Sequence, residues 1–332
     1  MVLVAGGIKN LALNLPDSHL YDPKTDQWIE TRSLPIGVTN PHGFMRSIVL
    51  PNGQVLIAGG EDDNSVETVG GTSALVHSNN AYLFTLNERH PSLSSWDYTR
   101  VKANNKISRM PEGRTTSGLV LLKDGRVLNV GGLGPAFDGL LSATNTASIF
   151  DPQTGIWSKA APMPAVFGLE EDEIVPPYPT APGSRWGPMA ERLDNGQVLV
   201  AGGFGGVFFQ FFRRSALLYD PTTNSWQMTT PTSFRRYIGS WSATLPAGAG
   251  ILLAGPAFSD DYGLRNVTGE IFHPESGTWT PAPVPAGPLP PADSFESQLL
   301  RLSTGRVQIA GGINFFGPNA ESGSWILREK NP

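Results

Sequence analysis

Three arginines stand at similar places in this sequence, where their guanidinium groups could hold an anionic ligand. Arg114, Arg185 and Arg236 each lie a few residues before a segment that begins a new apolar run. A guanidinium binds carboxylate or phosphate through paired hydrogen bonds, so these residues are candidate ligand-binding groups. The structural alternative is that each one binds loop carbonyls or pairs with Glu191, Asp293 or Glu296.

Glu191 and Glu296 are the candidate catalytic carboxylates. Glu191 interrupts the otherwise apolar run Met189–Leu193. A carboxylate there costs free energy unless it is paired or faces water. If it is desolvated, its pKa rises and it could act as a general acid or base. The alternative is an ion pair with an adjacent arginine.

The sequence also holds a dense aromatic segment, Phe208-Phe209-Gln210-Phe211-Phe212. It could form the apolar wall of a ligand pocket. It could also pack between neighbouring loops, or form a patch for a protein partner. Further aromatic candidates for ligand binding lie in comparable loops: Trp186, Tyr237, Trp241, Phe315 and Phe316. The two tryptophans could stack on a carbohydrate.

We expect neither a metal site nor a cofactor. The five histidines are dispersed, which argues against a zinc triad. Two oxygen-rich segments, Glu61-Asp62-Asp63 and Asp260-Asp261, leave calcium as an alternative, although neither has EF-hand spacing. The chain has no cysteine, which excludes disulfides, thiolate ligands and cysteine nucleophiles.

These candidate residues lie beside a sequence motif that recurs along the chain. The motif is a short apolar run that ends in two glycines. It reads VLVAGG at 2–7, VLIAGG at 55–60, VLNVGG at 127–132, VLVAGG at 198–203 and VQIAGG at 307–312, with a degenerate copy, ILLAGP, at 251–256. Apolar runs without alternation predict strands that are buried on both faces. Paired glycines permit a close backbone approach that side chains would prevent.

Two further motifs accompany most of these runs. Leu-x-x-Gly, as in Leu50–Gly53, precedes it and predicts a hairpin turn. An aromatic residue, Asp-Pro and a later tryptophan follow it, as in Tyr21–Trp28 and Tyr219–Trp226. The Asp-Pro segment predicts a turn between two further strands. One repeat is therefore four antiparallel strands, which we call a, b, c and d, and this is the composition of a propeller blade.

The glycine-ended runs, the Tyr-Asp-Pro segments and the spaced tryptophans resemble the bacterial Kelch repeat over nearly the whole chain. The resemblance implies an all-β fold, a six-bladed Kelch-type β-propeller that forms one domain over residues 1–332. The first repeat lacks strand a and the last lacks a clear strand d, so we expect an incomplete or unusual closure. The b–c and d–a loops vary most and share one face, where we expect function.

Kelch proteins include copper oxidases similar to galactose oxidase, but those need a cysteine-crosslinked tyrosine that this chain cannot form. Other members epimerise sialic acid, join or cyclise natural products, or bind proteins. We therefore expect a small molecule at the mouth of the propeller channel. If the protein is an enzyme, a cofactor-independent isomerase, cyclase or transferase is expected. The alternative is a non-catalytic propeller that binds a protein partner or a carbohydrate.

The composition excludes some partners. A net charge of −5 without a basic run argues against nucleic-acid binding. No apolar run is long enough to span a membrane. The first residues, Met1–Gly7, lack the features of a signal peptide, which favours the cytoplasm as the expected compartment.

Overall fold

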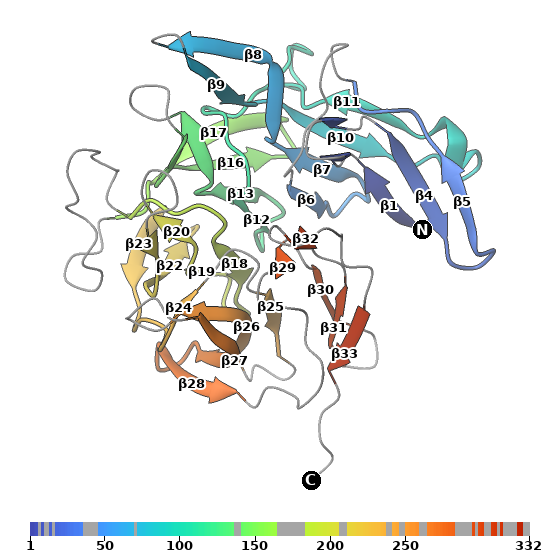
Figure 1. Ribbon diagram of the computed structural model, residues 1–332. Helices are drawn as coiled ribbons and strands as arrows, with labels where there is room; N and C mark the ends of the chain where they lie inside the picture. The colour runs from blue at the N-terminus through green and yellow to red at the C-terminus, as the bar shows by residue number, and fades with distance from the viewer. Residues whose placement is uncertain are drawn as a thin grey trace. The chain divides into compact units, whose positions relative to one another are not determined.

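The computed structural model of the chain is almost entirely β-structure, as the sequence predicts (Figure 1). Its one helix among the described residues is the short 3-10 helix η1 (Pro91–Leu93). The chain divides into two compact units, residues 1–162 and 163–332. The structure describes residues 1–5, 8–9, 13–14, 17–35, 46–69, 72–135, 141–164, 183–205, 211–236, 241–245, 250–258, 264–282, 294–295, 298–301, 307–310, 313–314 and 324–327.

The first unit contains three antiparallel sheets, which we number 1 to 3 in chain order. Sheet 1 comprises β1 (Val2–Ala5), β4 (Ser18–Asp22) and β5 (Gln27–Glu30). Sheet 2 comprises β6 (Arg46–Val49), β7 (Val55–Ala58), β10 (Ala81–Thr85) and β11 (Ser95–Tyr98). Sheet 3 comprises β12 (Gly118–Leu121), β13 (Val127–Val130), β16 (Ala147–Asp151) and β17 (Ile156–Ala160).

The second unit contains sheets 4 to 6. Sheet 4 comprises β18 (Met189–Arg192), β19 (Val198–Ala201), β22 (Ala216–Asp220) and β23 (Ser225–Met228). Sheet 5 comprises β25 (Trp241–Thr244), β26 (Ile251–Phe258), β27 (Leu264–His273) and β28 (Thr278–Ala282), with β24 (Arg235–Arg236) paired to the end of β26. Sheet 6 comprises β30 (Gln298–Arg301), β31 (Val307–Ala310) and β33 (Ser324–Leu327).

The order of strands within the sheets follows the repeat. Sheets 2 to 5 place strands a, b, c and d side by side, all antiparallel. Among the described residues, sheet 1 begins with strand b and sheet 6 ends with strand c. These are the two places where the sequence lacks a strand. The prediction of four-stranded antiparallel repeats is confirmed, and the prediction of a single domain over residues 1–332 stays a prediction.

Several of the b–c connections, which the sequence predicts as loops, extend as two-stranded ribbons. The ribbons are β2 (Ile8–Lys9) with β3 (Leu13–Asn14), β8 (Glu61–Val69) with β9 (Thr72–His77), β14 (Leu133–Pro135) with β15 (Leu141–Ala143), and β20 (Phe204–Gly205) with β21 (Phe211–Phe212). A further short pair joins β29 (Ser294–Phe295) to β32 (Ile313–Asn314). Some of the residues that the sequence places in b–c loops therefore lie in short β-strands.

Neighbouring sheets pack face to face through apolar side chains. The cluster between sheets 2 and 3 contains Leu56, Met110, Val127 and Phe150. The cluster between sheets 4 and 5 contains Leu199, Leu218, Leu253 and Phe272. Within each unit the a strands of successive sheets are neighbours, since β12 contacts β6, and β25 contacts both β18 and β30. This packing explains why β13 and β19 are buried on both faces, as the sequence predicts. The prediction is wrong for β1, where Val2 and Val4 are exposed.

An aromatic pair joins strands c and d in five sheets. The aromatic residue near the end of strand c lies directly opposite the tryptophan of strand d, with ring centroids 4.9 to 5.1 Å apart. The pairs are Tyr21–Trp28, Phe84–Trp96, Phe150–Trp157, Tyr219–Trp226 and Phe272–Trp279. Sheet 2 keeps the pair although its c–d connection is longer and lacks the Asp-Pro turn. The cross-strand contact therefore fixes the register of these two strands.

The paired glycines allow two close approaches of the backbone. Gly59 has φ +75, and a Cβ there would overlap the carbonyl oxygen of Arg114, which precedes the next sheet. That oxygen accepts a hydrogen bond of 2.9 Å from the amide of Gly60. In sheet 4, a Cβ on the second glycine, Gly203, would lie 2.7 Å from the carbonyl oxygen of Trp186, just before strand a of the same sheet. In these two sheets the pair therefore connects strand b to its surroundings through contacts that only glycine permits.

The substitution Gly59→Ala should destabilise the protein far more than Gly53→Ala. Both glycines have positive φ, but nothing lies within 4 Å of a Cβ on Gly53. We expect a loss of about 1–2 kcal/mol for Gly53→Ala from the backbone conformation. Gly59→Ala should cost a further ~1–3 kcal/mol from the overlap with Arg114. Urea denaturation of the two variants measures this difference, and equal losses would contradict the assignment.

Candidate functional site

The guanidiniums of Arg114 and Arg185 bind backbone carbonyls. In Arg114, Nη1 donates to the carbonyl oxygens of Gly131 (3.1 Å) and Thr146 (3.0 Å). In Arg185, Nη1 donates in the same way to Gly202 (3.3 Å) and Ser215 (3.0 Å). Their exposed fractions are 1% and 0%, and burial lowers the pKa of Arg114 to about 10. This is the structural alternative that the sequence leaves open for them.

A hydroxyl completes each arginine contact. Nη2 of Arg114 donates to Oγ1 of Thr146 (2.9 Å), and Nη2 of Arg185 donates to Oγ of Ser215 (2.8 Å). Within its own sheet, each arginine thus connects the first glycine after strand b to the residue just before strand c. The contact recurs in sheets 3 and 4, so it is part of the repeat.

Arg236 forms a buried ion pair with Glu270 of strand β27. Glu270 has an exposed fraction of 2%, and its Oε1 also accepts a hydrogen bond of 2.7 Å from the amide of Ser233. Burial lowers the pKa of Arg236, and the charge of Glu270 opposes that shift. Sequence reasoning missed Glu270 and considered Glu191, Asp293 and Glu296 as partners. One feature of the sequence could have revealed Glu270 as a buried partner. It is a charged residue in strand c, at the position where sheet 4 has the apolar Leu217.

Glu191 lies in strand β18, with strand β25 of the next sheet beside it. Its Oε1 accepts a hydrogen bond of 2.8 Å from Oγ of Ser242. Within the described part of the chain no arginine or lysine forms an ion pair with it. Burial raises the pKa of the Glu191 carboxyl, and the Ser242 hydrogen bond only partly offsets that rise. The structure thus supplies a partly buried carboxyl with a neutral partner, which is the chemistry of a general acid or base.

Three aromatic rings form a cluster in the same unit. The rings of Trp186 and Phe204 stack with centroids 5.3 Å apart, and those of Phe204 and Phe212 lie 4.5 Å apart. Two backbone hydrogen bonds, of 2.6 and 2.8 Å, hold Trp186 beside Phe204. Trp186 and Phe212 remain partly exposed. Phe204, which sequence reasoning did not select, is therefore the centre of this aromatic cluster.

The remaining predicted site residues are placed in part or not at all. Phe211 lies in β21 and Trp241 begins β25, but the structure describes only their backbone. The other candidates lie outside the described residues: Phe208, Phe209, Tyr237, Glu296, Phe315 and Phe316. Arg185, Trp186, Glu191, Phe212 and Arg236 therefore belong to the second unit and Arg114 to the first. Of these residues the structure brings together Trp186 and Phe212, which meet through Phe204.

His77 is buried at the end of ribbon β8–β9 in the first unit. Neither ring nitrogen has a hydrogen-bond partner in the described part of the molecule. Burial lowers the pKa of this imidazole to about 4, so it is neutral near pH 7. The backbone around it is tightly packed, because a Cβ on Gly113 would overlap the His77 carbonyl oxygen.

Neither a metal cluster nor a membrane helix is found in the described parts of the chain. No group of three or more acidic or histidine side chains there could hold a metal ion. The calcium alternative involves Asp260 and Asp261, which lie outside these parts, and Glu61–Asp63, described only by their backbone in β8. No described helix is long and apolar enough to cross a bilayer.

Comparison with known proteins finds no family model and no curated protein that matches this chain.

Replacing Glu191 with glutamine should change how stability depends on pH. The folded-state pKa of Glu191 is raised, so its contribution to stability is fully present below the unfolded pKa and is lost as pH rises through the folded pKa. Glu191→Gln removes this loss. We expect the free energy of unfolding of the variant, relative to wild type, to increase from pH 4 to pH 8. A constant difference in urea denaturation would contradict a desolvated carboxyl.

His77 should make the protein sensitive to acid. Its folded pKa of about 4 lies below the ordinary value of 6.5, so its contribution to stability is present above pH 6.5 and is lost as pH falls toward 4. The loss should approach about 3 kcal/mol. His77→Gln should remove this part of the pH dependence, whereas the exposed control His90→Gln should retain it. Urea denaturation between pH 7 and pH 4 makes the measurement.

Proposed function

We propose that this chain is a Kelch-type β-propeller in which the six sheets are blades around a common axis. Three observations support the proposal. The sheets follow one sequence repeat, successive sheets within each unit pack face to face, and their a strands are neighbours. These are the features expected of propeller blades, whose first strands surround the axis.

We further propose that the protein binds a small molecule beside strand a of sheet 4 and transfers a proton to or from it through Glu191. The observation that carries this proposal is the Glu191 carboxyl, which is partly buried, has a raised pKa and has a serine hydroxyl as its partner. A carboxyl whose pKa is closer to neutrality both gives and accepts protons efficiently. Isomerisation or cyclisation without a redox cofactor is the reaction class that fits such a group.

Other residues of the second unit serve as support for Glu191 in this proposal. The cluster of Trp186, Phe204 and Phe212 supplies an apolar wall. Arg185 binds carbonyls and Arg236 pairs with Glu270, so both act as structural braces. The ligand therefore needs no strong negative charge, and a neutral or weakly polar substrate is favoured over a phosphate ester.

A thermal-shift screen of a metabolite library, followed by mass spectrometry of each ligand after incubation, tests this function. Wild type should bind at least one small molecule and convert it. Glu191→Gln should still bind that molecule but lose about 10²-fold or more of its turnover, the usual contribution of a general acid or base. The exposed control Glu275→Gln should retain wild-type turnover. Unchanged turnover in Glu191→Gln would refute the catalytic role.

The alternative function is a non-catalytic module that binds a protein or a carbohydrate. The ribbon of β8 and β9 favours it, because it extends from the b–c side of sheet 2 (Figure 1). A pull-down that recovers a stoichiometric protein partner, together with no converted metabolite, would replace the catalytic proposal with this one.

A further inference from the structure

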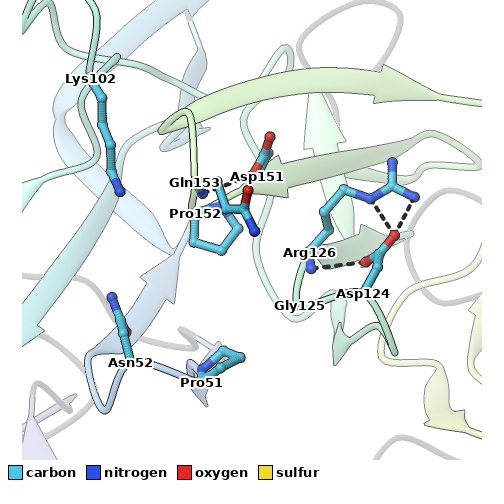
Figure 2. A pocket seen from close by; sticks show the side chains of 9 residues that line it. All are labelled: Pro51, Asn52, Lys102, Asp124, Gly125, Arg126, Asp151, Pro152 and Gln153. Carbon is cyan, nitrogen blue, oxygen red and sulfur yellow. Dashed lines mark hydrogen bonds and ion pairs between the residues drawn. The ribbon is translucent and has the colours of Figure 1, made fainter.

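A cavity of about 460 Å³ lies in the first unit, at the turns of sheets 2 and 3 (Figure 2). Pro51 and Asn52 belong to the a–b turn of sheet 2, and Asp124 to Arg126 form that of sheet 3. In an antiparallel repeat the a–b and c–d turns lie at the end opposite the b–c connections. The cavity is therefore separate from the loop face on which the sequence predicts function, and its size is ordinary for a small-molecule site.

One wall of the cavity is a segment that departs from the repeat. Residues 99–108 follow strand d of sheet 2 and fold back on themselves, with a bridge between Arg100 and Ile107. The amide of Lys102 donates to the carbonyl oxygen of Thr154 (2.8 Å), in the c–d turn of sheet 3. This contact holds Lys102 at the cavity, where Figure 2 shows its side chain directed toward Asn52.

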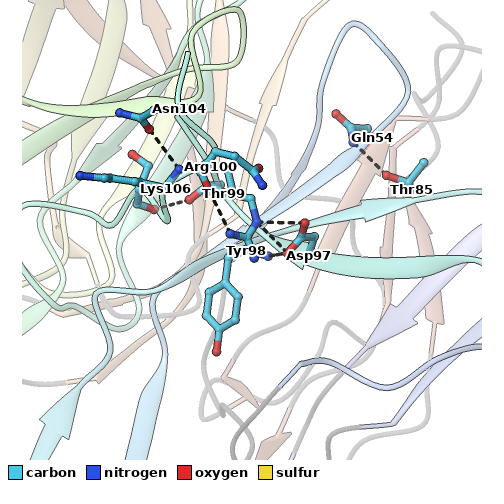
Figure 3. A network of polar contacts seen from close by, with 10 residues as sticks. Gln54, Thr85, Asp97, Tyr98, Thr99, Arg100, Asn104 and Lys106 are labelled. Atoms are coloured by element: carbon cyan, nitrogen blue, oxygen red, sulfur yellow. Dashed lines mark hydrogen bonds and ion pairs between the residues drawn. The ribbon is translucent and has the colours of Figure 1, made fainter. Parts of the chain in front are cut away.

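The fold-back segment is held by its own polar contacts (Figure 3). Nε of Arg100 donates to both carboxylate oxygens of Asp97, at 3.2 and 3.1 Å. Nη1 of Arg100 donates to the carbonyl oxygen of Asn105 (3.1 Å), and Thr99 Oγ1 donates to that of Ser108. These bonds order the segment before any ligand binds, which lowers the entropic cost of binding.

The positive and negative charges around the cavity are equal in number. Lys102 and Arg126 are cationic, whereas Asp124 and Asp151 are anionic. Arg126 and Asp124 neutralise each other in an ion pair of 2.7 Å. Asp151 would repel an anionic ligand, and Lys102 would repel a cation. A neutral ligand with many hydrogen-bonding groups fits this wall best.

We propose that this cavity binds a small neutral saccharide. Hydroxyl groups both donate and accept, so they can accept from Lys102 and donate to the carboxylate of Asp151. Gln153 adds an amide that offers a donor and an acceptor. Pro51 and Pro152 offer apolar ring faces to the C–H groups of a sugar. The cavity belongs to the first unit and Glu191 to the second, so this inference does not depend on the proposed function.

Isothermal titration of the whole protein with a panel of neutral saccharides tests the proposal. The panel contains glucose, galactose, mannose, maltose, lactose, sucrose and diacetylchitobiose, with galacturonate and glucosamine as charged comparators. We expect at least one neutral sugar to bind more tightly than both charged comparators. Lys102→Met and Gln153→Leu should each raise its Kd about tenfold or more, the effect of losing one or more hydrogen bonds.

Three controls make the outcome decisive. Lys106→Met removes a second exposed lysine of the fold-back segment and should leave the Kd unchanged. Glu191→Gln should also leave it unchanged, which separates this site from the proposed catalytic one. Both cavity variants should keep the wild-type urea midpoint, because neither side chain has a polar contact within the described residues. The proposal fails if no sugar of the panel binds wild type, if the charged comparators bind more tightly, or if both cavity variants bind as wild type does.

Discussion

The structure depends on how closely the chain can approach the paired glycines that follow strands b such as β7 and β19. At Gly59 the backbone before the next sheet passes where a side chain would be, and at Gly203 the backbone before strand a of the same sheet does so. Both contacts require glycine, for steric reasons and because φ is positive. Sheets that share such contacts must follow one another at a fixed spacing. The apolar clusters between them form as a consequence.

The buried arginines reinforce this constraint. Arg114 and Arg185 bring a guanidinium into the interior, where it donates to carbonyl oxygens and a hydroxyl. Arg114 also lies 3.7 Å from the carboxylate of Glu112. A planar group with five donors suits several carbonyls converging on one place. In sheet 5 the arginine at the corresponding position, Arg236, pairs with the buried carboxylate of Glu270. The repeat therefore tolerates different partners for the arginine at this position.

Much of the fold could be predicted from the sequence because its signals are local and repeated. The glycine pairs, the Asn-Gly and Asp-Gly turns and the aromatic–tryptophan spacing each predict an element that the structure contains. In the described part of the chain, sheets 1 and 6 have three strands each, and the sequence motif for the fourth strand is absent in both repeats. The closed ring stays a prediction, since it depends on long-range packing that no motif encodes. The partner of Arg236 was missed for a similar reason: Glu270 is distant in sequence and adjacent only through the pairing of β26 with β27. The cavity at the turns of sheets 2 and 3 was missed because function was expected only in the variable b–c and d–a loops.

The pairing of Phe84 with Trp96 has a consequence for how this protein can change over evolutionary time. The two rings keep their contact although the intervening chain carries extra residues and the helix η1. Chain length between strands c and d is thus independent of their register. A longer c–d connection is therefore compatible with the same strand pairing in sheet 2. A symmetrical array of repeats can in this way acquire a unique segment at one position while the remaining repeats continue to maintain the scaffold.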